Sequence, residues 1–245
     1  MKKTFLSLSF ILVLACASLE PLLASYPIVI GKSKFKKEDR DVKNFNGVAA
    51  GGPIDVVITL GATESLRFEG DADAIATLIT EVKGNVLVIR PQNSWTSWAR
   101  KYENKKITAY VSAKTIKSLT MSGNGAMSVK GSIKGSTLAS TLSGSGSITA
   151  AIDVDSYTGV ISGSGNLNIS GKADKATITI SGSGSLTKKG LSVGSLSSVI
   201  SGSGSVYVNA EDHIDAVVSG SGSINYSGNA TVEQRVIGSG RVRKI

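Results

Sequence analysis

Apolar and polar residues alternate along most of the chain, and a glycine-rich tetrapeptide interrupts the alternation at regular intervals. The sequence SGSG, or a close copy of it, begins at residues 122, 143, 162, 181, 201, 219 and 237. Successive copies are 18 to 21 residues apart. Self-similarity at a fixed period of this length indicates a repeat architecture, in which each repeat is one supersecondary unit. A flexible linker has no reason to recur at such intervals.

Two columns of apolar residues flank the tetrapeptides. The residue immediately before each copy is Met121, Leu142, Ile161, Ile180, Ile200, Val218 or Val236. The second residue after each copy is Met127, Ile148, Leu167, Leu186, Val206, Ile224 or Val242. Most residues between are Ser, Asn, Thr or Lys, so the side chains alternate with the period of two that is typical of strands.

Short strands that recur at one period predict parallel stacking of successive coils. We therefore predict an all-β fold, a single-stranded parallel β-helix: a solenoid with coils of about 19 residues and a right-handed course. Each apolar column becomes an internal ladder, and glycines occupy corners where the chain needs positive φ or close backbone approach. Aromatic residues make up only 5% of the chain, which suits a thin aliphatic core. An up-and-down antiparallel barrel is the alternative, but it does not require matched glycine columns.

The first half of the chain is less regular. We predict a signal peptide at residues 1–24, a basic flexible arm at 25–43, degenerate capping coils at 44–121 and regular coils at 122–245. Apolar residues near helical spacing in "ADAIATLITEV" (72–82) predict a short helix over one end of the solenoid. The stretch "PQNSWTSWARKYENKK" (91–106) is predicted to be a loop.

The run "FNGVAAGGPIDVVITLG", followed by the serial SGSG units, resembles the family called putative autotransporter adhesin, head GIN domain. The similarity covers roughly residues 40–245. The resemblance implies an exported bacterial β-solenoid, with adhesion as the role that its name suggests. The sequence closes on the repeat strand "GSGRVRKI", so we expect neither a translocator barrel nor self-translocation.

The N-terminus predicts export. Lys2 and Lys3 precede the apolar stretch "TFLSLSFILVLACAS", and cleavage after Ala24 suits a signal peptidase. Cys16 in "VLAC" offers a competing lipobox-like reading, in which this cysteine carries a lipid anchor. No later segment has the length and hydrophobicity of a transmembrane span. We predict a protein of the periplasm or of the cell surface.

No motif predicts catalysis, and we expect no metal and no cofactor. "GLSVG" around Ser192 matches the nucleophile-elbow pattern, and His213 is the only histidine, but the match lies between solenoid strands where no strand–turn–helix is expected. The acid pairs Asp153/Asp155 and Asp212/Asp215 are expected to be solvated turn residues. One histidine without a mature cysteine makes a poor zinc site.

The best candidate for recognition is the aromatic stretch, with Trp95, Trp98, Arg100 and Tyr102 as ligand contacts. Exposed aromatic rings beside cations can stack on sugars or hold an anionic polymer. The alternative is that the tryptophans fold back and cap the open end of the solenoid. The net charge of +9 comes from dispersed residues, so we expect no specific nucleic-acid partner. A cell-surface glycan or lipopolysaccharide is the expected partner, and the solenoid ends offer a route to oligomers.

The function hypothesis is therefore a non-enzymatic, exported binding or adhesion module. Its ligand would lie at the aromatic stretch or along a flat face of the solenoid. A glycan-active enzyme on the same scaffold and a purely structural envelope protein are the alternatives. Carboxylates gathered on one face would favour the enzyme, whereas a bare face of Ser, Thr and Asn would favour binding.

Overall fold

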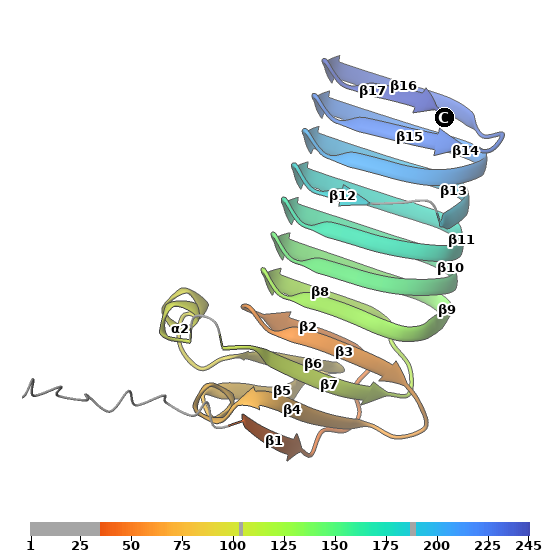
Figure 1. The fold of residues 1–245 in the computed structure, drawn as a ribbon. Helices are drawn as coiled ribbons and strands as arrows, with labels where there is room; N and C mark the ends of the chain where they lie inside the picture. The colour runs from red at the N-terminus through yellow and green to blue at the C-terminus, as the bar shows by residue number, and fades with distance from the viewer. Residues whose placement is uncertain (1–34, 103–104, 187–189) are drawn as a thin grey trace, which may run out of the picture. The chain divides into compact units, whose positions relative to one another are not determined.

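The described part of the chain is a β-solenoid. The computed structural model describes residues 35–102, 105–186 and 190–245. It has about seven turns with coils of about 19 residues, which confirms the predicted fold class. Figure 1 shows the coils from β8 (Ser118–Gly123) to β17 (Arg241–Lys244) stacked one upon the next, with α2 (Trp95–Lys101) near the N-terminal end of the stack. The predicted signal peptide lies outside the described residues, and the hand of the coil stays a prediction.

The regular coils are built from long strands that bend between two stretches. They comprise β8 (Ser118–Gly123), β9 (Ala126–Gly144), β10 (Ser147–Gly163), β11 (Asn166–Gly182), β12 (Ser185–Leu186), β13 (Leu191–Gly202), β14 (Ser205–Gly220), β15 (Ser223–Ser227), β16 (Thr231–Gly238) and β17 (Arg241–Lys244). All of these strands pair in parallel with the equivalent strand of the neighbouring coil. Parallel stacking of identical stretches is therefore confirmed.

Each coil presents two surfaces, one on either side of its SGSG corner. In the stretch before the corner, Ser162 stands opposite Ser143 in the preceding coil and Ser181 in the following one. In the stretch after the corner, Ile148 stands opposite Met127 and Leu167. We call the outward surfaces of these two stretches the pre-corner face and the post-corner face.

The two predicted apolar columns form the core. Twelve of the fourteen side chains are buried: Met121, Leu142, Ile161, Ile180, Ile200, Val218, Met127, Ile148, Leu167, Leu186, Val206 and Ile224. The two members in the last coil are less covered, because no further described coil packs on them: Val236 is 37% exposed and Val242 is partly buried. Stacked burial of aliphatic side chains, worth about 25 cal/mol per Å² of apolar surface, is thus the main stabilising contribution.

The two glycines of each corner meet different requirements, as the corner at Gly163 and Gly165 shows. Gly163 has φ of +122°, a conformation that side chains with a Cβ rarely adopt. Gly165 lies so close to the coil below that a Cβ would stand 2.6 Å from the carbonyl oxygen of Gly146. Between them, the N–H groups of Ser164 and Gly165 both donate to the carbonyl oxygen of Gly144, at 3.0 and 2.9 Å. The corner therefore repeats because each copy fits onto the copy beneath it.

Tyr157 is the one aromatic side chain enclosed by the regular coils in the described part of the chain. It is fully buried, and its hydroxyl lies beside Gly159, where a Cβ would stand 3.1 Å from it. Within the described residues no group meets hydrogen-bond geometry with this hydroxyl. Burial raises the pKa of the Tyr157 phenol, and the nearby Ser140 hydroxyl opposes that rise only in part. The ring stands opposite Leu138 in the preceding coil and Ala176 in the following one.

The N-terminal end departs from the simple coil. The strands β2 (Gly47–Gly51) and β3 (Asp55–Leu60) form the first coil, with Ala50 opposite Met121 and Val56 opposite Met127. Beyond them, β6 (Val86–Pro91) and β7 (Ile107–Ala113) continue the parallel pairing. Then the direction reverses: β4 (Ser65–Asp71) and β1 (Phe35–Arg40) pair antiparallel beyond β7, and β5 (Leu78–Lys83) pairs antiparallel with β6.

Three local predictions at this end differ in part from the structure. The helix expected at 72–82 is only α1 (Ala72–Ile75), because the β-branched residues that follow it pair as β5. The loop expected at 91–106 contains α2 (Trp95–Lys101). Residues 35–40, placed in the flexible arm by the sequence pattern, form β1.

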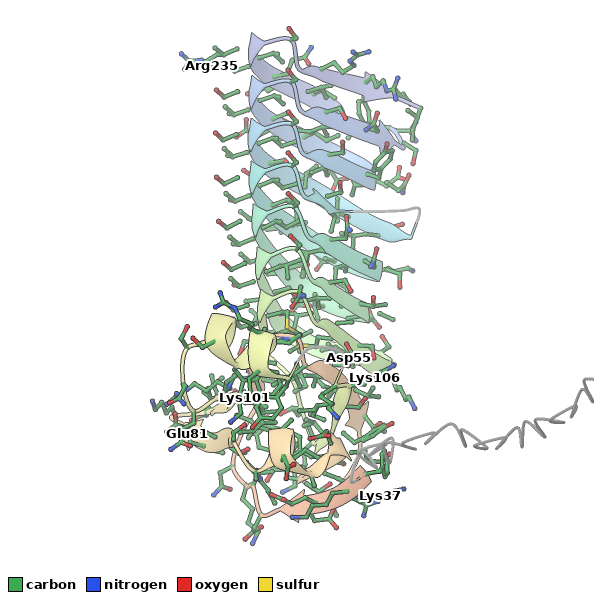
Figure 2. The ribbon with its side chains drawn as sticks, turned by 60° about the vertical axis from the view of Figure 1, so that its left-hand side comes forward. Lys37, Asp55, Glu81, Lys101, Lys106 and Arg235 are labelled. Atoms are coloured by element: carbon green, nitrogen blue, oxygen red, sulfur yellow. The ribbon has the colours of Figure 1, made fainter. Side chains whose placement is uncertain are left out.

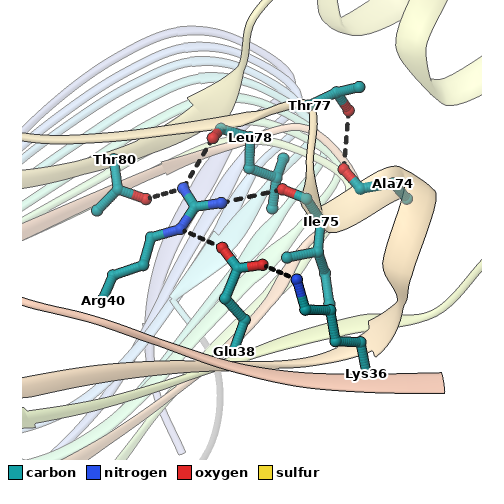
Figure 3. Close-up of polar contacts among 8 residues, drawn as sticks. All are labelled: Lys36, Glu38, Arg40, Ala74, Ile75, Thr77, Leu78 and Thr80. Atoms are coloured by element: carbon teal, nitrogen blue, oxygen red, sulfur yellow. Dashed lines mark hydrogen bonds and ion pairs between the residues drawn. The ribbon is translucent and has the colours of Figure 1, made fainter.

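Arg40 explains why β1 is ordered. Its guanidinium donates to the Leu78 carbonyl and to the Thr80 hydroxyl at 2.7 Å each, and to the Ile75 carbonyl at 3.0 Å (Figure 3). It also bonds Glu38 at 3.0 Å. A rigid fork with several donors can satisfy acceptors from α1 and β5 at once. The Lys36 ammonium, followed by Arg40, holds the pKa of the Glu38 carboxyl below its ordinary value.

Candidate functional site

The predicted aromatic contact residues belong to α2 and to the residue after it. Trp98 is only 4% exposed and packs in the core, and its indole N–H donates to the Thr77 hydroxyl at 2.7 Å. The Tyr102 ring lies 5.1 Å from the Trp98 ring and is half-buried, with its hydroxyl 3.3 Å from the Asp73 carbonyl. The side chain of Trp95 lies outside the described part.

The described side chains of the predicted contact residues have two different roles: two of them pack against the protein, and one is exposed. Trp98 and Tyr102 anchor α2 onto the segment of α1, as the capping alternative requires. A buried indole with a satisfied N–H offers no face for a sugar ring. Arg100 is exposed in the last turn of α2 and remains accessible to a ligand.

The two predicted acid pairs lie within strands and not in turns: Asp153 and Asp155 belong to β10, and Asp212 and Asp215 belong to β14. Asp153 lies within β10 opposite Lys134 of the preceding coil and Lys172 of the following one, so this carboxylate has a lysine on either side in the ladder. The serine of the elbow-like motif, Ser192, stands opposite Asn209, whereas His213 stands opposite Ser195. The register therefore keeps Ser192 and His213 apart in the ladder.

Within residues 35–102, 105–186 and 190–245, no three His, Cys, Asp or Glu side chains are grouped as a metal site would require. In the same part of the chain, neither helix has the length and apolar character needed to cross a membrane.

A bare face of small residues runs along the stack instead. It is the pre-corner face of the five coils from β8 to β13, and three outward positions per coil alternate with the buried ones. We call it the Ser/Thr face; its residues are Ser118, Thr120, Ser122, Ala139, Thr141, Ser143, Thr158, Val160, Ser162, Thr177, Thr179, Ser181, Ser197, Val199 and Ser201. Twelve of the fifteen carry a hydroxyl, and none carries a charge.

The register arranges these side chains in three straight rows. The middle row, for example, places Thr141 opposite Val160, and Thr179 opposite Val199. Neighbouring members of a row are about 4.8 Å apart, and neighbouring rows about 6.6 Å, as strand spacing and rise dictate. Figure 2 shows short side chains along this edge of the stack, with Arg235 labelled at its C-terminal end.

The hydroxyls of the Ser/Thr face are not used by the protein itself. Among the side-chain hydrogen bonds of the described residues, none involves a member of this face. The post-corner face differs, because its polar side chains bond one another from coil to coil. Ser205 and Ser223 are 3.2 Å apart, and Arg243 donates to Asn225 at 2.6 Å. The free hydroxyls therefore distinguish the Ser/Thr face.

Charged residues lie elsewhere on the same coils or at the ends of the Ser/Thr face. The bend of the strands, away from the corner, holds six charged residues: Lys134, Asp153, Asp155, Lys172, Asp174 and Lys175. Along the face, Asp215 is the first charged residue beyond β13, followed by Glu233 and Arg235. At the other end, Ala49, Gly51, Val88, Arg90 and Asn93 line a mostly apolar hollow that also reaches Thr120. The neutral face thus has defined limits.

The stacked parallel coils and their repeated corners define the class of the protein, which is a β-solenoid. The chain belongs to the family described as "Putative auto-transporter adhesin, head GIN domain", whose model matches residues 44–230. This confirms the resemblance found in the sequence. The family and several of the solved structures that resemble this chain carry the name of adhesins.

Solved structures share the fold. A "putative adhesin" from Bacteroides fragilis has 24% identity and a TM-score of 0.77, covering 86% of this chain and 97% of its own. A "putative lipid binding protein" from Parabacteroides distasonis has 20% identity and a TM-score of 0.69, covering 87% and 98%. A "putative adhesin" from the same species has 23% identity and a TM-score of 0.66, covering 88% and 98%. No protein with a curated function matches the chain.

Proposed function

We propose that this protein is an exported, non-enzymatic binding protein of the adhesion type, and that the Ser/Thr face is its contact surface. The observation that supports this role is the set of twelve hydroxyl side chains that stand in rows without protein hydrogen bonds. Membership of a family named for adhesins agrees with it. The lysines on either side of Asp153 argue against a role for this carboxylate in a glycan-active enzyme.

The proposed ligand is an uncharged glycan of a cell surface. Serine and threonine hydroxyls both donate and accept hydrogen bonds, as sugar hydroxyls do. The methyl groups of Thr179 and Val160 can contact the C–H faces of sugar rings. Each hydrogen bond contributes only about 0.5–1.5 kcal/mol net, so affinity has to come from many of them along the rows.

A matched pair of variants tests this contact surface. Thr177→Lys places a long cation on the Ser/Thr face, between Thr158 and Ser197 of the neighbouring coils. Ser170→Lys adds the same charge to an exposed position of the same strand outside the face. In a glycan-array and lipopolysaccharide binding screen of the mature chain, we expect Thr177→Lys to weaken binding by about 10-fold or more and Ser170→Lys to leave it unchanged. Equal loss in both variants, or in neither, contradicts the proposal.

The same screen separates the other ligand classes. If Thr177→Lys strengthens binding to lipopolysaccharide, the ligand would be an anionic headgroup held by basic residues. A lipid acyl chain is favoured only by the apolar hollow beside Ala49 and Val88, and one solved neighbour is named as a lipid binding protein. Ala49→Leu narrows this hollow, so loss of binding in that variant alone would assign the ligand to it.

The aromatic stretch receives its own test. Trp98→Phe keeps an apolar ring but removes the hydrogen bond to Thr77. We expect lower stability, by about 1–2 kcal/mol, and unchanged ligand binding. Arg100→Ala should leave stability unchanged because the side chain is exposed. A loss of binding in Arg100→Ala would restore α2 as the contact surface.

Export is part of the proposal and rests on residues 1–24. Mass spectrometry of the protein purified from the envelope should find Ser25 as the first residue if an ordinary signal peptidase acts. A lipid-modified Cys16 as the first residue would instead place the protein on a membrane through that anchor. Cell fractionation then distinguishes periplasm from surface.

A further inference from the structure

The Ser/Thr face is flat as well as neutral. Its outward side chains are Ser, Thr, Ala and Val, so none extends more than two bonds from its Cα. Parallel register keeps equivalent atoms at one height from coil to coil. The face is therefore a low-relief lattice with two fixed repeats, along the stack and across it.

A single flexible polysaccharide chain would bind weakly to a lattice of this kind. A chain lying on a flat surface keeps about half of its own surface in water, and neither a charge nor an aromatic ring of the face adds affinity. Each hydrogen bond gained also requires a rotating hydroxyl and a flexible glycosidic linkage to be immobilised. The entropy lost in this way is of similar size to the net free energy of the hydrogen bond. A partner whose groups are already ordered does not incur that cost.

A second copy of this face is a weaker occupant. Five coils at about 4.8 Å and three rows about 6.6 Å apart give a patch of roughly 500 Å². Stable protein–protein interfaces bury about 800 Å² on each partner and have an apolar centre. Here the centre consists of hydroxyl groups around Val160 and Val199.

From these observations we infer that the ligand of the Ser/Thr face is the surface of an ordered, uncharged polysaccharide, in which parallel chains present a repeating array, and not a single soluble chain. The inference rests on the proposed function and specifies its ligand. Many weak contacts then form at once, because neither the protein lattice nor the polymer lattice has to be ordered on binding.

The test compares one chemistry in two physical states. Microcrystalline cellulose and chitin serve as ordered probes, and soluble cello- and chito-oligosaccharides of six sugars serve as matched flexible probes. Depletion assays measure binding of the mature chain to the particles, and calorimetry measures binding to the oligosaccharides. We expect the apparent Kd for at least one particle to be about 10-fold or more below that of its oligosaccharide, and Thr177→Lys, but not Ser170→Lys, to raise it by a similar factor.

The outcomes separate this inference from the proposed function. Soluble oligosaccharides that bind as tightly as the particles, with loss in Thr177→Lys, would retain the function and overturn the inference. Particle binding that is equal in both lysine variants would overturn the assignment of the face. Failure to bind either state of either polysaccharide would count against both. A dimer in sedimentation experiments that Thr177→Lys dissociates would assign the face to a second copy.

Discussion

At the scale of single residues, the corner glycines set the tightest limits. In Gly165→Ala, the new Cβ would stand 2.6 Å from the Gly146 carbonyl oxygen, and backbone at that distance has to move. We expect a loss of about 1–3 kcal/mol in the free energy of unfolding, as for other overpacked sites. Ser164→Ala, at the exposed residue between the two glycines, is the control and should change stability by less than about 0.5 kcal/mol. Urea denaturation followed by circular dichroism measures both.

A second residue-scale prediction concerns the buried hydroxyl of Tyr157. Since it has no hydrogen bond within the described residues, Tyr157→Phe removes a desolvated group without leaving a partner unpaired. We expect the variant to match or exceed the wild type in stability, by up to about 1 kcal/mol. Tyr207→Phe, at a half-exposed position of β14, is the comparison. A loss of more than about 1 kcal/mol would mean that the hydroxyl contributes a real bond.

The same phenol predicts an alkaline limit to stability. Because burial raises the pKa of Tyr157 in the folded state, the unfolded chain ionises first, near the ordinary value of 10.0. Below that pH the stability is unaffected; above it, ionisation favours the unfolded state by about 1.4 kcal/mol per pH unit. The wild type should therefore lose stability faster than Tyr157→Phe between about pH 10 and 11.5. Parallel melting curves for the two proteins would contradict this.

At the scale of elements, the regular coils follow from the sequence and the N-terminal end does not. A strand such as β10 is specified locally, because apolar columns and corner glycines recur at one period. The antiparallel pairing of β1, β4 and β5 depends on contacts between distant segments, above all those of Arg40 with α1 and β5. Such a pairing leaves no periodic signal, so residues 35–40 look like a basic arm.

The candidate sites show the same division. The Ser/Thr face was recoverable from the sequence, because its outward residues recur in register with the apolar columns; reading only the buried positions overlooks it. The burial of Trp98 was available from the sequence as the capping alternative, but its hydrogen bond was not, since the indole donates to the hydroxyl of Thr77, which lies 21 residues earlier. Aromatic residues beside cations look alike in sequence whether they cap a core or face a ligand.

Arg40 supplies the prediction for this end. Arg40→Lys replaces a planar fork by a point charge, which cannot reach the Leu78, Thr80 and Ile75 acceptors together. We expect the amides of β1 to exchange hydrogen about 10-fold or more faster, while those of β10 stay protected, because stability in a solenoid is local. Arg67→Lys, whose side chain is 52% exposed in its ion pair with Asp39, is the matched control. Equal exchange rates in the two variants would show that Arg40 does not hold β1.

At the scale of the whole molecule, the solenoid is an array in which each coil interacts with its neighbours only. Deleting residues 145–163 removes one coil of 19 residues, the offset by which β10 and β11 pair, and joins Gly144 to Ser164. The junction restores an SGSG corner, and Leu142 and Leu167 keep their columns. Because stability in such an array is a sum of repeat and interface contributions, we expect a folded protein with a lower melting temperature.

Deleting one coil also shortens the Ser/Thr face, so the same variant tests the proposed function. If the contacts act together along the rows, losing one coil of five should weaken binding to an ordered polysaccharide by more than the one-fifth expected from area alone. Deleting only residues 154–163 is the control. Removing half a coil takes away one pre-corner stretch with the start of its corner, so the coils on either side cannot pair in register, and that protein should lose more stability than the full-coil deletion. A full-coil deletion that folds and binds as tightly as the wild type would show that the ligand does not extend along the face.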